Sequence, residues 1–316
     1  MSAVNKARGV STSSSWALTG AVNMRNIAIA KHGRNFSTEV RNTNGRWLAT
    51  LTRGAYTVVL AGPSRRFAEG KASVSHAKWV RTYPEPYAGE VDQDWLEQAL
   101  GANKARVPDV LAIAMQYIRG AEAVHEDGLQ IAGDARYGPG TEKKRQEGSD
   151  FNDYLGVTWT YPGEPADPPE HKQFQCLDCS GYMRMVWGFR HHLPGTGYED
   201  RVPLSVVPKA DRRSIPRRAY EIYASAPGVI TIPQGTPPID FSRLGVGDLV
   251  FFDADTKDGP QIDHVGMYLG RDVDRRYRFI SSRKQRNGPT LGDYHGASLL
   301  DGTGLYARSF CAVRRI

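Results

Sequence analysis

Residues 174–189 read FQCLDCSGYMRMVWGF, a polar entry followed by an amphipathic run. Asp178 belongs to the residue types that cap helix N-termini. After it, apolar side chains recur at the three-and-four spacing of one helix face. These side chains are Tyr182, Met183, Val186 and Trp187. The segment therefore predicts a helix that begins after Asp178, buries one face and carries Cys179 in its first turn.

Cys179 is a candidate nucleophile because of this position. The free backbone N–H groups and the positive dipole end of a helix start favour a thiolate, and can lower a cysteine pKa from about 8.5 to roughly 3.5–7.5. An inert buried thiol is the alternative, since reactivity requires a base from elsewhere in the chain. A zinc or redox pair with Cys176 is disfavoured, because Cys311 is the only other cysteine and no second C-x-x-C exists.

A second pair of segments supplies the base. Residues 244–252 read LGVGDLVFF and residues 263–270 read DHVGMYLG, which predicts a turn and two β-strands. His264 begins the second of these strands. Imidazole is the right kind of group to deprotonate a thiol, and a strand holds it more rigidly than a loop does.

Together, D-C-S-G-Y at residues 178–182 and G-D-L-V-F-F…H-V-G-M-Y-L-G at residues 247–270 resemble the NlpC/P60 family of papain-like cysteine peptidases, in the family's usual order. The resemblance covers about residues 133–316 and implies an α+β fold, with the cysteine helix packed on an antiparallel sheet. It implies amide hydrolysis through a Cys179 thioester with His264 as base. The implied substrate is the stem peptide of bacterial peptidoglycan, typically cleaved between D-glutamate and the diamino acid, with no cofactor and no metal.

The third catalytic position departs from the family pattern. In that pattern, a His, Asn or Gln usually follows a Phe-Ile-like pair, whereas here Ser281 follows residues 279–280. A serine hydroxyl can accept an imidazole N–H bond but orients the ring weakly and carries no charge. Ser281 is the positional match, and the alternatives for the role are Ser282, Gln285 and His295.

The resemblance also implies substrate-binding residues. Tyr137, Asp178 and Ser180 match positions that contact the free amino end of the substrate, where an ionised Asp178 would pair with an ammonium group. Tyr137 as a simple loop aromatic and Asp178 as a helix N-cap are the alternatives. The polar stretch 140–173 replaces a short loop of compact family members, and is expected to form a lid or wall or to displace Tyr137.

The composition limits the classes of partner. The chain has 316 residues, 40% of them hydrophobic and 24% charged, as in soluble globular proteins. Three cysteines argue against a disulfide scaffold. The net charge of +7 suits an anionic partner. Without an interleaved aromatic and basic pattern, nucleic acid is not expected, and anionic wall polymers are a further candidate partner. A basic cluster at residues 209–218 would meet such a polymer or simply form a solvated helix face.

The predicted organisation has three parts: a flexible arm at 1–40, a β-rich module at 41–104, and a catalytic domain at 105–316 with insertions at about 140–173 and 191–243. Within them, residues 47–52, 55–61 and 78–83 predict strands, residues 91–100 and 107–118 predict helices, and residues 277–281 and 305–313 predict further strands.

A wall substrate implies an extracellular or cell-wall location. The sequence shows neither the apolar core of a secretory signal nor the ~18 consecutive apolar residues of a membrane span. Three routes would bring a protein without such a signal to the cell wall: non-classical export, lysis, or carriage on a phage or injection particle. Two rival functions stay open: a catalytically weak wall- or particle-binding protein, and an acyl or amide transferase that uses the same Cys–His pair.

Overall fold

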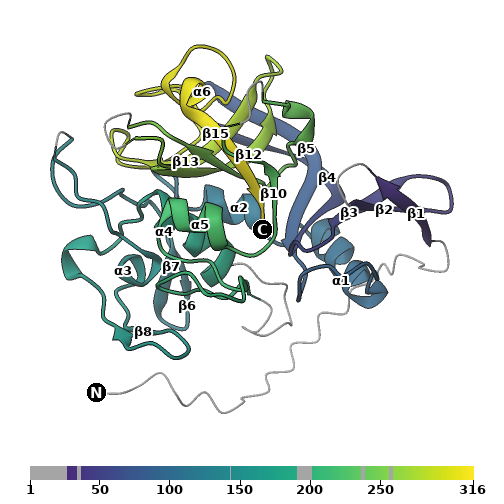
Figure 1. Ribbon diagram of the computed structural model, residues 1–316, viewed down its shortest axis with the longest axis horizontal. Coiled ribbons are helices and arrows are strands. Elements are labelled where there is room, and N and C mark those ends of the chain that lie inside the picture. Colours follow the sequence, from purple (N-terminus) through teal and green to yellow (C-terminus); the bar gives the residue numbers. More distant parts are fainter. Residues whose placement is uncertain (1–26, 34–36, 143, 191–200, 236–238, 256–258) are drawn as a thin grey trace.

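The computed structural model describes residues 27–33, 37–142, 144–190, 201–235, 239–255 and 259–316. Two antiparallel sheets, one of five strands and one of six, are accompanied by short helices (Figure 1). The protein is therefore of the α+β class, with a β-rich N-terminal region. Among the described residues, none of the helices is long and apolar enough to cross a membrane.

The five-stranded sheet is a simple meander in which each strand pairs with the next one along the chain. Its strands are β1 (Ile27–Gly33), β2 (Ser37–Asn42), β3 (Trp47–Thr52), β4 (Thr57–Glu69) and β5 (Ala72–Thr82). Helix α1 (Gln93–Lys104) is capped by Asp92, which accepts the Trp95 N–H at 3.0 Å. It buries Leu96 in one cluster with Val58 and Leu60 of β4.

The predicted flexible arm at 1–40 is wrong for its last part. β1 pairs with β2, so the sheet begins at residue 27 rather than after residue 40. Pairing with a neighbouring strand satisfies the backbone N–H and C=O groups of this polar segment, and its composition alone does not predict this pairing. The rest of the predicted arm, residues 1–26, lies outside the described residues.

The six-stranded sheet has the order β10-β15-β11-β12-β13-β14. Its strands are β10 (Val229–Ile232), β11 (Leu249–Phe252), β12 (His264–Arg271), β13 (Tyr277–Arg283), β14 (Gly288–Thr290) and β15 (Phe310–Arg315). The two strands predicted from residues 244–252 and 263–270 are β11 and β12, which pair with each other. The C-terminal strand β15 inserts between β10 and β11.

The strand predicted at residues 305–313 is half wrong. Helix α6 (Leu305–Ser309) precedes β15. This turn of helix places the Tyr306 ring edge-on against Phe252 and Phe279, at centroid distances of 5.4 and 5.3 Å. Aromatic packing against the sheet thus overrides the local strand pattern.

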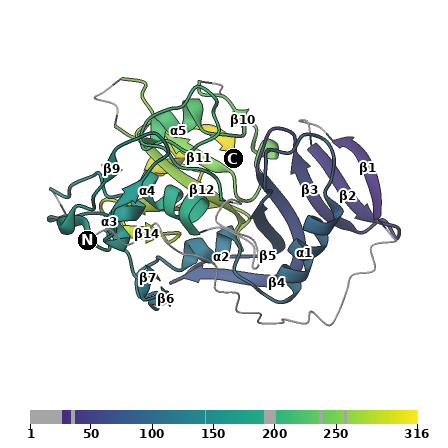
Figure 2. The same cartoon turned by 90° about the horizontal axis from the view of Figure 1, so that it is seen from below.

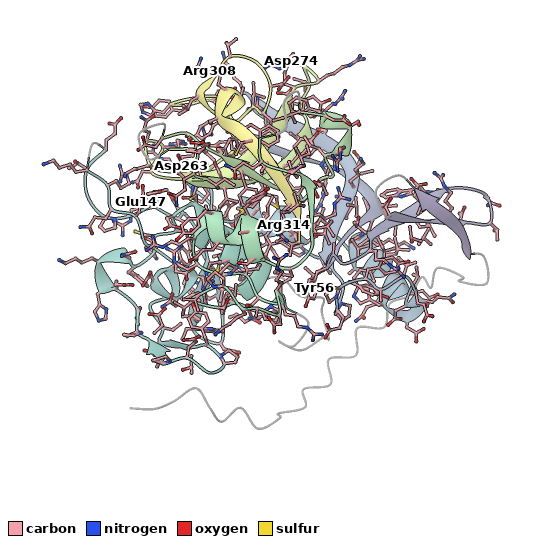
Figure 3. All side chains as sticks on the ribbon, in the orientation of Figure 1. Tyr56, Glu147, Asp263, Asp274, Arg308 and Arg314 are labelled. Atoms are coloured by element: carbon pink, nitrogen blue, oxygen red, sulfur yellow. The ribbon has the colours of Figure 1, made fainter. Side chains whose placement is uncertain are left out.

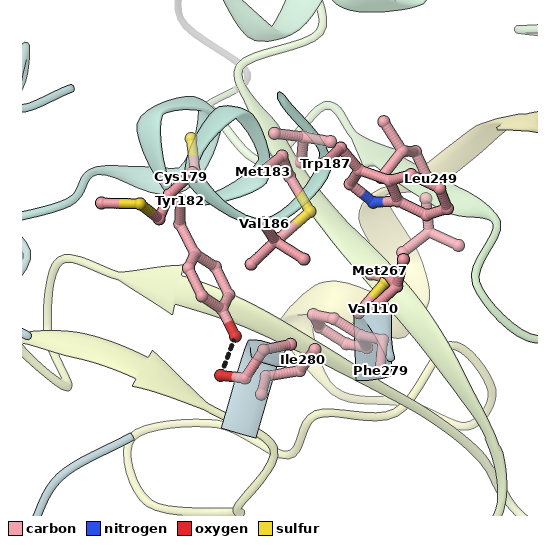
Figure 4. Close-up of a cluster of buried hydrophobic side chains, with 14 of the residues drawn as sticks. Val110, Cys179, Tyr182, Met183, Val186, Trp187, Leu249, Met267, Phe279 and Ile280 are labelled. Atoms are coloured by element: carbon pink, nitrogen blue, oxygen red, sulfur yellow. Dashed lines mark hydrogen bonds between the residues drawn. The ribbon is translucent and has the colours of Figure 1, made fainter. Parts of the chain in front are cut away.

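The helix predicted after Asp178 is present as α4 (Cys179–Arg184), which continues into a π-helical stretch, η3 (Met185–Arg190). Its four predicted apolar side chains are fully buried. They pack between α2 (Val110–Met115) and the larger sheet, and Tyr182 donates its hydroxyl to the Ala114 carbonyl at 2.7 Å (Figure 4). Gly181 is required here, because a Cβ on it would lie 2.2 Å from the Ser149 carbonyl oxygen.

The stretch 140–173 has regular structure of its own. It contains α3 (Phe151–Leu155), a hairpin of β8 (Trp159–Thr160) and β9 (Ala166–Asp167), and η2 (His171–Gln173). A small hairpin of β6 (Val124–Glu126) and β7 (Leu129–Ala132) precedes it. The second predicted insertion contributes α5 (Ala219–Ser225), β10 and η5 (Phe241–Arg243), and its residues 191–200 lie outside the described residues.

The long β4–β5 hairpin connects the two sheets, because it extends from the smaller sheet towards α2 and β12 (Figure 2). At its tip, the Glu69 carboxylate accepts the N–H groups of Leu291 and Gly292 at 2.9 and 3.1 Å and the Thr290 hydroxyl at 2.7 Å. Arg286 pairs with the same carboxylate at 2.9 Å. The N-terminal region therefore supports the chain that follows β14.

Candidate active site

Cys179 is the first residue of α4 and is only 6% exposed. The Asp178 carboxylate caps the helix by accepting the Gly181 N–H at 2.8 Å. The backbone N–H of Val265 lies close enough to the Cys179 thiol to favour its charged form. Because α4 packs against β12, the structure brings two of the three predicted catalytic residues, Cys179 and His264, to the junction of these two elements.

The predicted lowering of the Cys179 pKa is wrong for this structure. Burial raises the pKa of the thiol to about 12, and the negative charge of Asp178 adds to the effect. The Val265 N–H and the Arg217 charge act in the opposite direction but are outweighed. Because the thiol is enclosed, the free-energy cost of desolvating a thiolate exceeds the stabilisation that the start of a short helix provides.

His264 is buried between aromatic rings. Its ring centroid lies 5.6 Å from that of Phe252 and 5.4 Å from that of Tyr306. Burial lowers the pKa of the imidazole to about 3, and the nearby charge of Arg283 contributes. Near neutral pH, Cys179 and His264 are thus both uncharged, and a proton must move during any nucleophilic attack.

Ser281 lies on β13, the strand that pairs with β12. A Cβ on Gly266 would lie 3.0 Å from the Ser281 Cβ, so Ser281 faces Gly266 across the two strands, two residues along β12 from His264. However, across the described residues neither the Ser281 hydroxyl nor His264 Nε2 has a hydrogen-bond partner. The structure therefore does not show the bond by which Ser281 would orient the imidazole.

The alternatives for the third position are engaged or exposed. The Ser282 hydroxyl donates to the Leu177 carbonyl at 2.5 Å, and Gln285 is exposed. His295 is also exposed, with its Nε2 3.6 Å from a carboxylate oxygen of Glu142. These contacts give none of the three a role at His264.

Tyr306 is a site residue that sequence reasoning missed. Its ring packs against His264, and the Arg283 guanidinium carbon lies 4.9 Å from its ring centroid. Burial raises the pKa of its hydroxyl, and the charge of Cys179 adds to the shift. Tyr306 therefore helps to enclose His264. No motif marked it, because its segment looked like a strand.

Asp178 is fully engaged within the chain. Its carboxylate accepts N–H groups from Gly148 and Gly181 and the Ser180 hydroxyl, at 2.8–3.1 Å. Arg217 Nη2 donates to it at 2.7 Å. Burial alone would raise the pKa of Asp178, but the charge and hydrogen bonds of Arg217 hold it below its usual value. Arg217 is a second site residue that was missed, because the sequence assigned it only to a basic cluster that meets an anionic polymer or forms a solvated helix face.

Tyr137 is buried, at 4% exposure, and close to the thiol. Burial raises the pKa of its hydroxyl well above the usual value, and the charges of Cys179 and Asp178 add to the shift. The stretch 140–173 therefore does not displace Tyr137 from Cys179. Glu147, from this stretch, lies at the edge of the molecule and pairs with Lys284 at 3.0 Å (Figure 3).

A buried ion network lies under α4. Arg184 is fully buried, and its Nε donates to both Asp150 carboxylate oxygens at 3.0 Å. Its other nitrogens donate to the carbonyls of Ser205 and Ile215 at 2.7 Å and to the Tyr161 hydroxyl at 2.6 Å. The network fixes the cysteine helix to the segments before and after it.

The structure thus has a cysteine at the start of a helix that packs on an antiparallel sheet bearing a histidine, the arrangement that the resemblance in the sequence implies. The model of the NlpC/P60 family matches residues 157–288, a range that contains both Cys179 and His264. Residues 157–288 therefore match the NlpC/P60 family, which confirms the resemblance seen in the sequence. Proteins of this family are generally cell-wall peptidases, typically cysteine peptidases.

One solved structure that matches is described as similar to a lipoprotein of the NLP/P60 family, from Staphylococcus aureus. It shares 20% sequence identity with this chain at a TM-score of 0.25. The match covers 52% of this chain and 38% of that chain, so this chain spans well under half the length of its neighbour. A search of curated proteins returned no match.

The neutral state of His264 predicts a pH dependence of stability. Because the folded pKa, about 3, lies below the usual 6.5, the unfolded chain binds a proton that the folded chain does not. As the pH is lowered from 6.5 to about 3, the contribution of His264 to the free energy of unfolding should therefore decrease, by up to roughly 1.4 kcal/mol per pH unit. Asp153 contributes to the pH dependence with the opposite sign, because its pKa in the folded protein is raised to about 7, mainly by burial.

The contribution of His264 is isolated by comparing wild type with His264→Gln in urea unfolding at several pH values. The difference in free energy between the two proteins should shrink as the pH falls, because only wild type loses the His264 contribution. Parallel pH profiles would show that folding does not lower the His264 pKa, and would contradict this prediction.

Proposed function

We propose that this chain is a cysteine peptidase that hydrolyses amide bonds in peptidoglycan stem peptides. The observation that supports it best is the packing of α4, which begins with Cys179, against β12, which begins with His264. This junction lies inside the region that matches the NlpC/P60 family. The bond proposed for cleavage joins D-glutamate to the diamino acid, and the site of action is the cell wall.

In the proposed mechanism, the Cys179 sulfur attacks the amide carbonyl carbon while His264 takes the thiol proton. His264 then returns this proton to the departing amine, which leaves a thioester. Water, deprotonated by His264, hydrolyses the thioester and releases the free thiol. Backbone N–H groups at the start of α4 stabilise the oxyanion. Ser281 is proposed to orient the imidazole, with weaker support than an amide or a second imidazole would give.

The test is incubation of the purified protein with defined muropeptides, with products identified by mass spectrometry. Wild type should cleave a stem peptide and Cys179→Ala should not. Cys311→Ala is the matched control, because that thiol is half-buried and contacts the Phe251 carbonyl at 3.5 Å. Equal cleavage by wild type and Cys179→Ala would refute the cysteine mechanism, and no cleavage by either would refute the peptidase.

A weakly catalytic wall-binding protein is the second candidate. The observation that favours it is the lack of a described hydrogen-bond partner for both His264 Nε2 and the Ser281 hydroxyl. In that case Cys179→Ala and wild type should sediment equally with purified wall material while neither releases peptide. An acyl transferase with the same residues would instead yield products that gain the mass of an added amine.

A further inference from the structure

The Arg217 side chain places a positive charge beside Cys179, the proposed nucleophile. Its side chain is 14% exposed, and its Nη2 lies 2.7 Å from the Asp178 carboxylate. Nη1 donates to the Ser180 hydroxyl at 2.7 Å, and Nε lies 3.5 Å from the Asp150 carboxylate. All three guanidinium nitrogens thus face the two residues that flank Cys179 and the acid beneath them.

The buried charges around the thiol are balanced. Asp150 and Asp178 provide two negative charges, and Arg184 and Arg217 provide two positive charges. Glu147, the other carboxylate whose charge reaches Cys179, is exposed and pairs with Lys284. Each of these described carboxylates therefore already has a cationic partner.

A substrate ammonium group gains affinity only from an anion that is not already compensated. To reach Asp178, an ammonium would have to displace a guanidinium that is held by several hydrogen bonds. Asp178 is adjacent to Cys179 in the chain, with Cα atoms about 3.8 Å apart, so this position lies within one or two substrate residues of the attacked carbonyl.

We infer that Arg217 determines the specificity of this site: it fills the cation position beside Asp178, excludes peptides with a free amino end there, and selects stem peptides whose amino end is acylated. This rests on the proposed function, since it assumes a peptide substrate. An acylated amino end is neutral and needs no anion. The acylated stem is the form that remains attached to the glycan, so the substrate class is intact wall polymer rather than released peptide.

The first test measures binding without turnover. In the Cys179→Ala background, calorimetry compares two stem peptides that differ only in acetylation of the amino end. The acetylated peptide should bind at least about tenfold more tightly, and adding Arg217→Met should abolish or reverse this preference. Equal or tighter binding of the free amine with Arg217 in place, or binding of neither peptide, would overturn the inference. Acetyl selectivity without cleavage by wild type would refute only the proposed hydrolysis.

A second readout needs no substrate. Cys179 is modified with a cationic and an anionic methanethiosulfonate (the aminoethyl and sulfonatoethyl reagents), and the rate at this thiol is followed by peptide mass spectrometry. Arg217→Met should raise the ratio of cationic to anionic rate by about tenfold, because it uncovers the Asp178 charge. The exposed neighbour gives the control Arg218→Met, which should leave the ratio unchanged.

Arg217→Lys keeps the charge but loses the planar fork, and covers the case in which Arg217→Met does not fold. With the charge kept, the rate ratio and the preference for the acetylated peptide should both stay close to wild type. An unchanged ratio in folded Arg217→Met, or a lost preference in Arg217→Lys, would show that Arg217 only supports the fold.

Discussion

Replacement of His264 by glutamine is expected to lower kcat/KM for stem-peptide hydrolysis by about 10³-fold, within the usual contribution of a general base. The Cys179 pKa of about 12 means that only about one thiol in 10⁵ is ionised at pH 7. Attack therefore depends on proton transfer to a neighbouring base rather than on a resident thiolate. Initial rates with a muropeptide, measured by chromatography, provide the comparison.

His295→Gln is the matched control. His295 is exposed and lies beside Glu142, so its replacement should leave kcat/KM within about twofold of wild type. A large loss in His295→Gln together with an active His264→Gln would move the base from β12 to the loop after β14, and would contradict the mechanism proposed above.

Arg184→Met is expected to lower the free energy of unfolding by about 3–5 kcal/mol, the usual cost of removing one partner of a buried ion pair. The substitution leaves Asp150 with only Arg217, at 3.5 Å, as a cationic partner. It also leaves the carbonyls of Ser205 and Ile215 without the donors they have now. Urea unfolding followed by circular dichroism measures the loss.

Arg218→Met controls for removal of a surface charge and should change the free energy of unfolding by less than about 0.5 kcal/mol. Arg184→Lys keeps the charge but not the five donors, so an intermediate loss is expected. A loss below about 1 kcal/mol in Arg184→Met would mean that the network under α4 contributes little to stability.

The elements around the site could be predicted because their signals are local. The helix after Asp178 has a capping residue and apolar side chains at helical spacing, and the sheet strands β11 and β12 are short apolar runs bounded by glycines. Such patterns depend on which face of an element is buried, and this can be read without knowing its neighbours.

The electrostatics of the site could not be predicted in this way. Arg217 lies 39 residues from Asp178 in the sequence, and only the fold brings its guanidinium to the carboxylate. The Cys179 pKa depends on how completely the packed chain encloses the thiol. Helix position alone predicted a shift of the wrong sign, because desolvation is a property of the packed structure.

The place of β15 in the larger sheet has a consequence for folding. This strand, residues 310–315, pairs with both β10 and β11, although about 60 residues of chain separate it from β11. Closing such distant pairs is slow, so refolding is expected to take milliseconds to seconds rather than microseconds. During synthesis, one edge of β11 stays unpaired until residues 310–315 have emerged, and a nascent chain with this open edge is exposed to pairing with a neighbouring chain.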